Sequence, residues 1–583
     1  MKDFFKYTLA TITGFLILGF LLFFLSITLM IKMVASTETK TVVPENAVFV
    51  LKLDGELSDR SSSNPIMEVL FSEPKSIGLD GIISSIKKAK ENPSIKGIYI
   101  DSGSLSASFA SLEAIRDALI DFKESDKFIV SYADQYSQGL YYLSSVADEV
   151  HLNPKGGLNW SGLSATPMFY TELFKKVGVE MQIFKVGTYK SAVEPYTETK
   201  MSQANREQVS QYLNDIWLHI THGISEARDI ELDKLNEYAD QMVLFQPAEF
   251  CTTNGLVDKL SYRSDMDEVL KEKVGEKPSL LSLNKMVNIP ESETNKAKDK
   301  IAIYYASGGI VDFSTKYSSE EIVEQKMSKD LKKLEDNDDI KAVVLRVNSP
   351  GGSAYASEQI WKAVSNLKAK KPVIVSMGDY AASGGYYISA AADYILAEPT
   401  TLTGSIGIFA IIPNVEGTTK KLGLTFDVVK TNKHSDFGSI GRALNQDEKL
   451  LLQNYINSGY DLFIQRCAEG RNMSNEKIRE IGEGRVWTGK RAKELGLVDE
   501  IGGMKKAIEI AADKAGISEY KIQDFPKQKE IFEQIFDLSG KDLIKSYLFS
   551  SDLLRIIDEN LVKQQLSKES ILQARLPYLL NIQ

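Results

Sequence analysis

Cysteine and histidine are scarce in this chain of 583 residues, which has two cysteines and four histidines. Cys251 and Cys467 are too few for a disulfide scaffold, so we expect each to be a buried free thiol. His219 and His222 lie three positions apart on an expected helix, but no third metal ligand is evident. A packed or solvated helix face is the better interpretation, and the sequence predicts no metal site.

An excess of positive charge is also lacking, because the formal net charge is −10. A protein that binds DNA or RNA would normally present a basic face to the phosphates. We therefore expect no nucleic-acid partner.

One long apolar run lies near the N-terminus. Residues 7–31 contain no charged side chain in 25 positions, which is long enough to cross a hydrocarbon core of about 30 Å as a helix. A cleavable signal would have a shorter apolar stretch of about 7–15 residues. Lys2 and Lys6 favour a cytoplasmic N-terminus. The pattern predicts an uncleaved transmembrane anchor, with the rest of the chain outside the cytoplasm.

The chain contains its own homologue. With a shift of 245 positions, residues 95–190 align without gaps to residues 340–435, and the motif GLVD recurs at 255–258 and 496–499. The repeat is about 200 residues long, so it is a whole domain rather than a solenoid or propeller unit.

Short apolar, β-rich runs alternate with helical stretches in both copies, which is typical of βαβ-type α/β folds. We expect one repeat over 46–265, a polar linker region over 266–299 and a second repeat over 300–515. A tail without counterpart in the first copy covers 516–583. Amphipathic helices are indicated there by the apolar residues Leu553, Ile556, Ile557 and Leu561.

The candidate nucleophile is Ser383, in the motif GDYAASGGYYIS. The pattern predicts a strand over 373–376 and a helix that begins near Ser383, so that amide N–H groups at the start of the helix face a reacting carbonyl. A serine hydroxyl also needs a base and donors for the developing oxyanion. The first copy has Gln138 in place of Ser383.

Two glycines are candidates for one of the oxyanion donors. Gly351 and Gly352 lie in SPGGSA, directly after an expected strand over 340–348, at what should be the same edge of the sheet as Ser383. The corresponding residues of the first copy are Ser106 and Ala107. The first copy has therefore lost the glycines together with the serine, which favours a functional role in the second copy.

The candidate base is Lys190, in VGTYKSAVEPY of the first copy, where the second copy has Ser435. A lysine can act as a base when burial depresses its pKa toward neutrality, and no acidic residue is adjacent to Lys190. His434, beside the matching position of the second copy, is the histidine alternative. Because the two copies retain different members of a serine–lysine pair, we expect one active site assembled from both halves.

A third candidate is Ser405 in TLTGSIG, whose hydroxyl could orient the lysine. Its counterpart in the first copy is Trp160, so the first copy lacks this polar group as well. Asp379 and Asp101 are weaker candidates and are better suited to capping or supporting turns.

Taken together, SPGG, GDYAASGGYYIS and TGSIG in the second copy, with GTYKSAVEP in the first, resemble the long, duplicated form of the signal peptide peptidase A (protease IV) family. The resemblance implies two tandem ClpP/crotonase-like repeats and a serine–lysine dyad shared between them. In the unduplicated form of the family the base occupies the position of Ser435, which leaves Lys433 as a lower-ranked alternative base. The implied roles are nucleophile for Ser383, general base for Lys190, lysine-orienting hydroxyl for Ser405, and oxyanion donors for Gly384 and for Gly352 or Gly351.

The same resemblance implies what the protein does and where. It implies a serine endopeptidase that digests cleaved signal peptides and other peptides, without a metal, nucleotide or other cofactor. It further implies a homotetramer on the lipid bilayer of a bacterial inner (cytoplasmic) membrane, with the catalytic portion in the periplasm.

Two other classes of protein stay open. A crotonase-like acyl-CoA enzyme would use a similar oxyanion geometry, although the expected location outside the cytoplasm argues against it because coenzyme A is cytoplasmic. A catalytically inactive membrane scaffold is the other, although the retention of Ser383, Lys190 and Ser405 argues against it.

Overall fold

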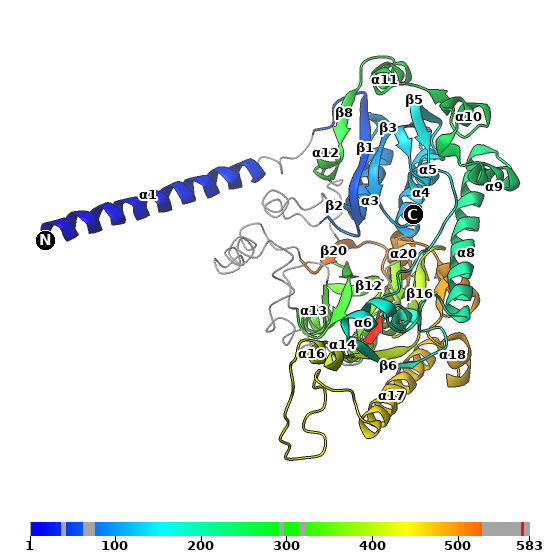
Figure 1. The fold of residues 1–583 in the computed structure, drawn as a ribbon. Helices are drawn as coiled ribbons and strands as arrows, with labels where there is room; N and C mark the ends of the chain where they lie inside the picture. Colours follow the sequence, from blue (N-terminus) through cyan, green and yellow to red (C-terminus); the bar gives the residue numbers. More distant parts are fainter. Residues whose placement is uncertain are drawn as a thin grey trace.

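The computed structural model has an α/β architecture built on three sheets, with helices packed around them (Figure 1). Each repeat has its own hydrophobic core, and the third sheet takes strands from both repeats. The structure describes residues 2–35, 42–61, 76–290, 297–314, 321–527 and 573–575.

Helix α1 spans Lys2–Ala35 and includes the long apolar run. Nevertheless, among the described residues no helix has the length and apolar character that crossing a bilayer requires. The predicted localisation, a single-pass anchor over 7–31 in the inner membrane with a periplasmic catalytic portion, is therefore wrong.

The sheet of the first repeat is entirely parallel, in the order β2-β1-β3-β4-β5-β7 with β8 also paired to β1. Its strands are mostly apolar and buried, as expected for a parallel sheet covered by helices. The strands are β1 Ala47–Ser58, β2 Ser76–Gly78, β3 Ile95–Ser106, β4 Phe128–Tyr136, β5 Glu149–Leu158, β7 Lys259–Leu260 and β8 Ser279–Ser282.

Helices and short 3-10 turns complete the first repeat and lead into the predicted linker region. They are α3 Leu79–Glu91, α4 Phe109–Lys123, α5 Gln138–Ser144, α6 Thr171–Val177, η1 Ser191–Val193, α7 Glu194–Thr197, α8 Gln203–Arg228, α9 Leu232–Asp240, η2 Val243–Phe245, α10 Ala248–Thr253, η3 Arg263–Asp265, α11 Met266–Val274 and α12 Leu283–Val287.

The sheet of the second repeat has the order β18-β16-β14-β12-β9-β20, with β15 joined to β14 and β19. Only the β16–β18 pairing is antiparallel among the described strands of this sheet. The strands are β9 Lys300–Ser307, β12 Ile340–Ser349, β14 Val373–Ala382, β15 Tyr394–Ala397, β16 Leu402–Gly404, β18 Val486–Thr488, β19 Glu500–Ile501 and β20 Lys521–Phe525.

The helices of the second repeat follow the duplication predicted from the sequence. Strand β12, helix α14 and strand β14 each begin 245 residues after β3, α4 and β4. The helices are α13 Glu324–Asp336, α14 Ala354–Lys368, α15 Gly384–Ser389, α16 Glu416–Lys421, α17 Gln446–Arg471, α18 Asn475–Ile481, α19 Gly489–Glu494 and α20 Met504–Ala515.

The third sheet joins the two halves of the chain. In it β6 of the first repeat pairs antiparallel with β17 of the second, from Ile408↔Val186 to Asn414↔Glu180. Its order is β11-β10-β13-β21-β17-β6. The strands are β11 Glu321–Val323, β10 Gly309–Val311, β13 Gly351–Ser353, β21 Gln573–Arg575, β17 Ile408–Asn414 and β6 Glu180–Val186.

Buried polar contacts also fix the two repeats against each other. Arg346 Nε donates to Asp59 Oδ1 at 2.9 Å, and both side chains are 4% exposed. Asp379 accepts hydrogen bonds from Ser111 N and from the hydroxyls of Ser111 and Ser108, at the start of α4 in the other repeat. Losing one partner of a buried ion pair typically costs about 3–5 kcal/mol, so these contacts give the halves a defined relative position.

The segments outside the two predicted repeats differ in how much the structure describes. The predicted linker region includes α11, β8 and α12, and β8 adds to the first sheet. The predicted tail contributes β20, which pairs with β9. Its expected amphipathic residues lie outside the described residues.

Both cysteines are buried free thiols as predicted, and burial raises the pKa of Cys251 to about 11.

Candidate active site

Three predicted site residues from two different repeats meet in the interior of the molecule. Lys190 Nζ donates to Ser383 Oγ at 2.8 Å and to Ser405 Oγ at 3.0 Å. The carbonyl of Ser405 accepts a further hydrogen bond from Lys190 Nζ at 3.0 Å. All three residues are 0% exposed. The amine therefore contacts three oxygen atoms in a site shielded from solvent.

The charge state of Lys190 is set by this environment. Burial lowers the pKa of its amine well below the ordinary value, and desolvation is the only cause of that shift. Burial disfavours the charged ammonium, so the neutral amine is populated at a lower pH than in an exposed lysine. A neutral amine beside a serine hydroxyl can accept its proton.

A turn of the second repeat, residues 482–485, holds the segment that carries Lys190. The carbonyl of Glu483 accepts a hydrogen bond from Tyr189 N at 2.8 Å. Its side chain accepts from Thr188 N and Thr188 Oγ1, each at 2.9 Å. The same turn contacts the third site residue, because Arg485 O accepts from Ser405 N at 2.7 Å. One turn therefore positions both the amine and the hydroxyl beside it.

Gly484 allows this close approach. Its φ is +75°, and a Cβ placed on it would lie 2.7 Å from both the N and the Cβ of Lys190. Gly407 packs on the same side chain, because a Cβ there would lie 3.2 Å from Lys190 Cδ. Sequence reasoning missed this turn, although the two glycines in Gly-Glu-Gly-Arg at 482–485 were an available signal for a tight backbone approach.

Ser383 lies at the junction between β14 and α15. Its φ of +55° is uncommon for a residue with a side chain, and such conformations cost on the order of 1–3 kcal/mol. The amide of Ser383 donates to Gly404 O at 2.8 Å, which ties the junction to β16. Ser405 also has a positive φ, of +52°. Two of the three meeting residues are thus in strained conformations that the surrounding contacts maintain.

The glycines predicted as oxyanion donors lie around the same junction. Gly384 is the first residue of α15. Gly352 lies in β13, where a Cβ would come 2.0 Å from Ile310 O, so only glycine fits. The amide of Gly351 already donates to Ser349 Oγ at 3.2 Å, which favours Gly352 over Gly351 as a donor to substrate.

The corresponding place in the first repeat is filled. Gln138 Oε1 accepts from Ser161 N at 2.9 Å and from Gly162 N at 2.8 Å, and its Nε2 donates to Gly162 O at 3.0 Å. Trp160, the counterpart of Ser405, is fully buried and packs on Trp217 with ring centroids 4.6 Å apart. In the first repeat, Gln138 and Trp160 therefore have a structural role at the positions that Ser383 and Ser405 occupy in the second repeat.

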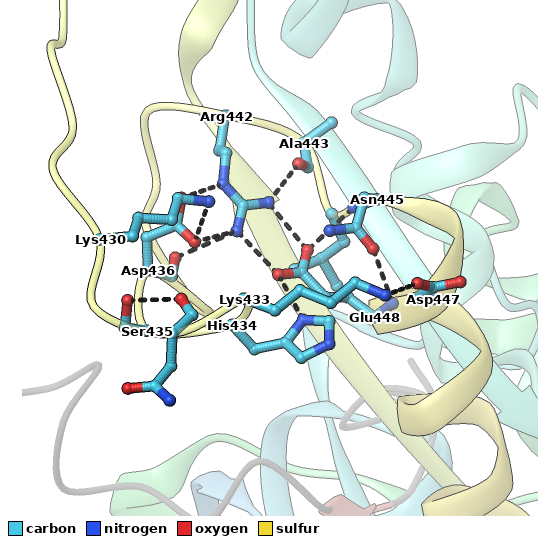
Figure 2. A network of polar contacts seen from close by, with 12 residues as sticks. Lys430, Lys433, His434, Ser435, Asp436, Arg442, Ala443, Asn445, Asp447 and Glu448 are labelled. Atoms are coloured by element: carbon cyan, nitrogen blue, oxygen red, sulfur yellow. Dashed lines mark hydrogen bonds and ion pairs between the residues drawn. The ribbon is translucent and has the colours of Figure 1, made fainter.

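The alternative bases lie in a separate polar network, shown in Figure 2. Lys433 pairs with Asp447, and His434 Nδ1 lies 3.4 Å from Glu448 Oε1. Arg442 bridges Asp436 and Glu448 in the same network. In the described part of the chain, neither alternative base is hydrogen-bonded to Ser383.

Two of the other histidines, His151 and His219, have local partners. His151 contacts Ser261 and Glu149, and His219 contacts Glu113. Across the described ranges, no group of three or more His, Cys, Asp or Glu side chains is arranged to hold a metal ion.

Comparisons with known proteins are consistent with this geometry. Residues 121–277 and 365–518 match Peptidase family S49. The chain belongs to this family. Residues 311–411 also match the ClpP-like SDH-type serine proteinase family. The two S49 segments fall in the two repeats, so the duplicated α/β fold with ClpP/crotonase-like repeats is confirmed.

Similar proteins come from bacteria and a plant. The chain is 35% identical to "Protease 4" of Haemophilus influenzae over 511 residues, 84% of this chain and 82% of the relative. It is 31% identical to "Serine protease SPPA, chloroplastic" of Arabidopsis thaliana over 491 residues, 82% and 70% of the two chains. "Putative signal peptide peptidase SppA" of Enterococcus faecium is 36% identical over 224 residues, 38% and 64% of the two chains. The predicted resemblance is confirmed, and the protein is a serine peptidase of this kind.

We expect Gly484→Ala to reduce peptide hydrolysis strongly, because the added methyl group would displace Lys190 from Ser383. Gly423→Ala is the matched control, since Gly423 has a similar φ of +72° and open space around its Cβ position. Both variants carry the strain of a positive φ, but only Gly484→Ala adds a clash with Lys190, so it should lose more thermal stability than Gly423→Ala. At a temperature where both variants are folded, kcat should fall about tenfold or more only for Gly484→Ala, equal to about 1.4 kcal/mol in the barrier. Equal activity of the two variants would show that the turn does not position the amine.

Proposed function

We propose that this protein is a serine endopeptidase that uses a Ser383–Lys190 dyad to digest cleaved signal peptides. The observation that carries the proposal is the 2.8 Å contact between Lys190 Nζ and Ser383 Oγ. Both groups are buried, and the amine has a pKa lowered by that burial. A hydroxyl activated by a neutral amine can attack a carbonyl without a histidine.

The mechanism follows from the contacts of the two groups. Lys190 takes the proton of Ser383 while Oγ attacks the peptide carbonyl, and the Ser405 hydroxyl keeps the amine oriented. Amides of Gly352 and Gly384 stabilise the oxyanion of the tetrahedral intermediate. The lysine ammonium then gives its proton to the leaving amine. Water, deprotonated by the same lysine, hydrolyses the acyl-enzyme and restores Ser383.

The substrate class is supported by a relative rather than by geometry. The Enterococcus faecium relative is named a putative signal peptide peptidase. Signal peptides contain an apolar segment of about 7–15 residues, so the preferred substrates should be apolar peptides rather than folded proteins.

Neither alternative class has an observation in its favour. Membership of a peptidase family argues against an acyl-CoA enzyme. The hydrogen-bonded contact of Lys190 with Ser383 and Ser405 argues against an inactive scaffold, because burying a lysine amine is costly and a non-catalytic chain gains nothing from it.

Ser383→Ala and Lys190→Met should each lower cleavage of an apolar fluorogenic peptide by about 10³-fold or more, because each removes one member of the dyad. Both variants should also lose covalent labelling by a fluorophosphonate probe. Lys433→Ala is the control and should retain both activities. Substantial cleavage by Lys190→Met, or its loss in Lys433→Ala, would refute the assignment of the base.

The pH dependence gives a separate test of the base. Because burial lowers the pKa of Lys190, kcat/KM should rise as the pH rises through that lowered value and reach a plateau well below about 10.4, the ordinary pKa of lysine. Lys190→Arg keeps a charged side chain throughout this range and should stay inactive. A rising limb centred on the ordinary lysine pKa would mean that the amine is not desolvated in the working enzyme.

We also propose that copies of the chain assemble by repeating the strand pairing seen between the two halves. Under the 245-residue shift, the counterparts of β17 and β6 are residues 163–169 and 425–431, and neither segment forms a strand. Each segment exposes apolar side chains: Met168 is 68% exposed, Phe426 57% and Val429 98%. Pairing of 425–431 with 163–169 of the next subunit would cover them, consistent with the homotetramer that the family resemblance implies.

The internal register predicts which residues meet in such an assembly. Within one chain, Pro413 of β17 lies opposite Met181 of β6. Under the 245-residue shift, the counterpart of Pro413 is Met168 and the counterpart of Met181 is Phe426. The proposed pairing therefore places Phe426 opposite the partner subunit's Met168. Directly opposed Cβ atoms are about 4.5–5.5 Å apart, close enough for a disulfide after a small adjustment. Met168→Cys/Phe426→Cys should therefore form covalent multimers on oxidation. The control Met168→Cys/Leu450→Cys, at an exposed position off this register, should not, and equal cross-linking of the two variants would contradict the pairing.

A further inference from the structure

Helix α8 belongs to the first repeat but lies along β18 of the second (Figure 1). One of its side chains, Gln208, is 1% exposed and faces the segment that carries Lys190. Its Nε2 donates to Tyr189 O at 3.0 Å and to Ser191 Oγ at 2.9 Å. A longer contact of 3.2 Å to Asn205 Oδ1 joins it to the first turn of α8. One buried amide therefore binds the residues on both sides of Lys190.

The oxygen of the same amide contacts the second repeat. Gln208 Oε1 accepts a hydrogen bond from Val486 N, in β18, at 3.2 Å. Val486 pairs with Gly404 of β16, and Gly404 O accepts from Ser383 N at 2.8 Å. Gln208 thus connects the backbone around the amine to the strands that hold the backbone of the nucleophile.

The equivalent helix of the second repeat has no such amide. Helices α8 and α17 are both 26 residues long, and they begin at Gln203 and Gln446, which are 243 positions apart. The counterpart of Gln208 is therefore Leu451, whose side chain is 60% exposed. The lysine is absent from the second repeat as well, where Ser435 takes its place. The amide thus occurs in the same repeat as the lysine.

An uncharged group is suited to this position. An opposite charge close to the amine would favour the ammonium form and raise the pKa of Lys190. The carboxylates near the segment are hydrogen-bonded elsewhere: Glu194 accepts from Ser202 Oγ, and Glu483 accepts from Thr188 Oγ1. A neutral amide can hold the segment by hydrogen bonds without adding such a charge.

We propose that Gln208 is a positioning residue, whose side-chain amide holds the segment around Lys190 against β18 and thereby keeps the amine on the Ser383 hydroxyl. This inference rests on the proposed role of Lys190 as the base. Without the amide, Tyr189 O and Val486 N would lose a buried partner, and the segment could move away from β18. The amine would then lie farther from Ser383 and be more accessible to water, which would raise its pKa toward the ordinary value.

The test compares Gln208→Met with Gln211→Met in the full chain. Methionine is close to glutamine in length and lacks the amide. Gln211 is the matched control because it lies one turn later on α8 and also contacts the second repeat, where its Oε1 accepts from Arg485 Nη2 at 2.6 Å. Cleavage of the apolar fluorogenic peptide is measured from about pH 5 to about pH 10, which spans the range below the ordinary lysine pKa. The temperature is one at which circular dichroism shows every variant to be folded.

We expect Gln208→Met to lower kcat about tenfold or more, because a displaced base transfers the proton less efficiently. Its KM should change less than about threefold, since Gln208 contacts the base segment rather than the substrate. The rising limb of kcat/KM should also move to higher pH. Gln208→Asn, whose amide is one methylene group shorter, should move the limb in the same direction. Gln211→Met should leave both kcat and the limb unchanged.

Two results would overturn the proposal. One is a loss of thermal stability in Gln208→Met with kcat and the pH profile unchanged, because the amide would then have a structural role alone. The other is an equal fall of kcat in Gln208→Met and Gln211→Met with the rising limb unmoved. If Gln208→Met does not fold, Gln208→Asn decides by the same two readouts.

The unmodified chain separates this inference from the proposed function. If it cleaves the peptide and the Gln208 variants keep its kcat and pH profile, the positioning role is refuted while the peptidase function stands. If it does not cleave the peptide, the proposed function fails, and the inference fails with it.

Discussion

The structure depends on keeping one lysine amine away from water and against a serine hydroxyl. Among the described residues, the amine of Lys190 forms no ion pair with a carboxylate, and its hydrogen bonds go to oxygens of Ser383 and Ser405. A buried ammonium is expensive, and the neutral amine is the form that this site favours. Burial thus favours the unprotonated amine, which can accept a proton as a neutral histidine would.

This arrangement needs two copies of the same domain with different residues. The proposed base, Lys190, comes from the first repeat just after β6, and the proposed nucleophile, Ser383, comes from the second repeat between β14 and α15. The antiparallel pairing of β6 with β17 and the buried Arg346–Asp59 pair fix the halves relative to each other. A chain with one such site needs no serine at the matching positions of the first repeat. These positions are part of the interior there and are occupied by Gln138 and Trp160.

Sequence alone predicted the parts of the molecule that local pattern and self-comparison encode. The 245-residue shift predicted equivalent elements, and α4 and α14 have the same length and relative position. The different residues retained by the two copies indicated Ser383, Lys190 and Ser405. In the structure the amine of Lys190 is hydrogen-bonded to the hydroxyls of both serines. The turn at 482–485 was missed because its role depends on contact with Lys190, almost 300 residues earlier in the chain. The pairing of β21 with β13 was missed for the same reason, since hydrophobic periodicity carries no information about which distant strand a segment joins. The apolar run at 7–31 led to a wrong localisation because the absence of charge over 25 residues was taken as sufficient for an anchor, whereas no described helix is long and apolar enough to cross a membrane.

The central claim is that the Lys190 amine is uncharged near neutral pH, and its titration tests that claim most directly. The protein can be labelled with lysine carrying ¹³C at Cε, with the Lys190 signal assigned by its absence from Lys190→Arg. The chemical shift of that signal should titrate far below about 10.4, the ordinary pKa of lysine. A titration at the ordinary value would show that the amine is charged in the resting enzyme and would contradict its role as the base.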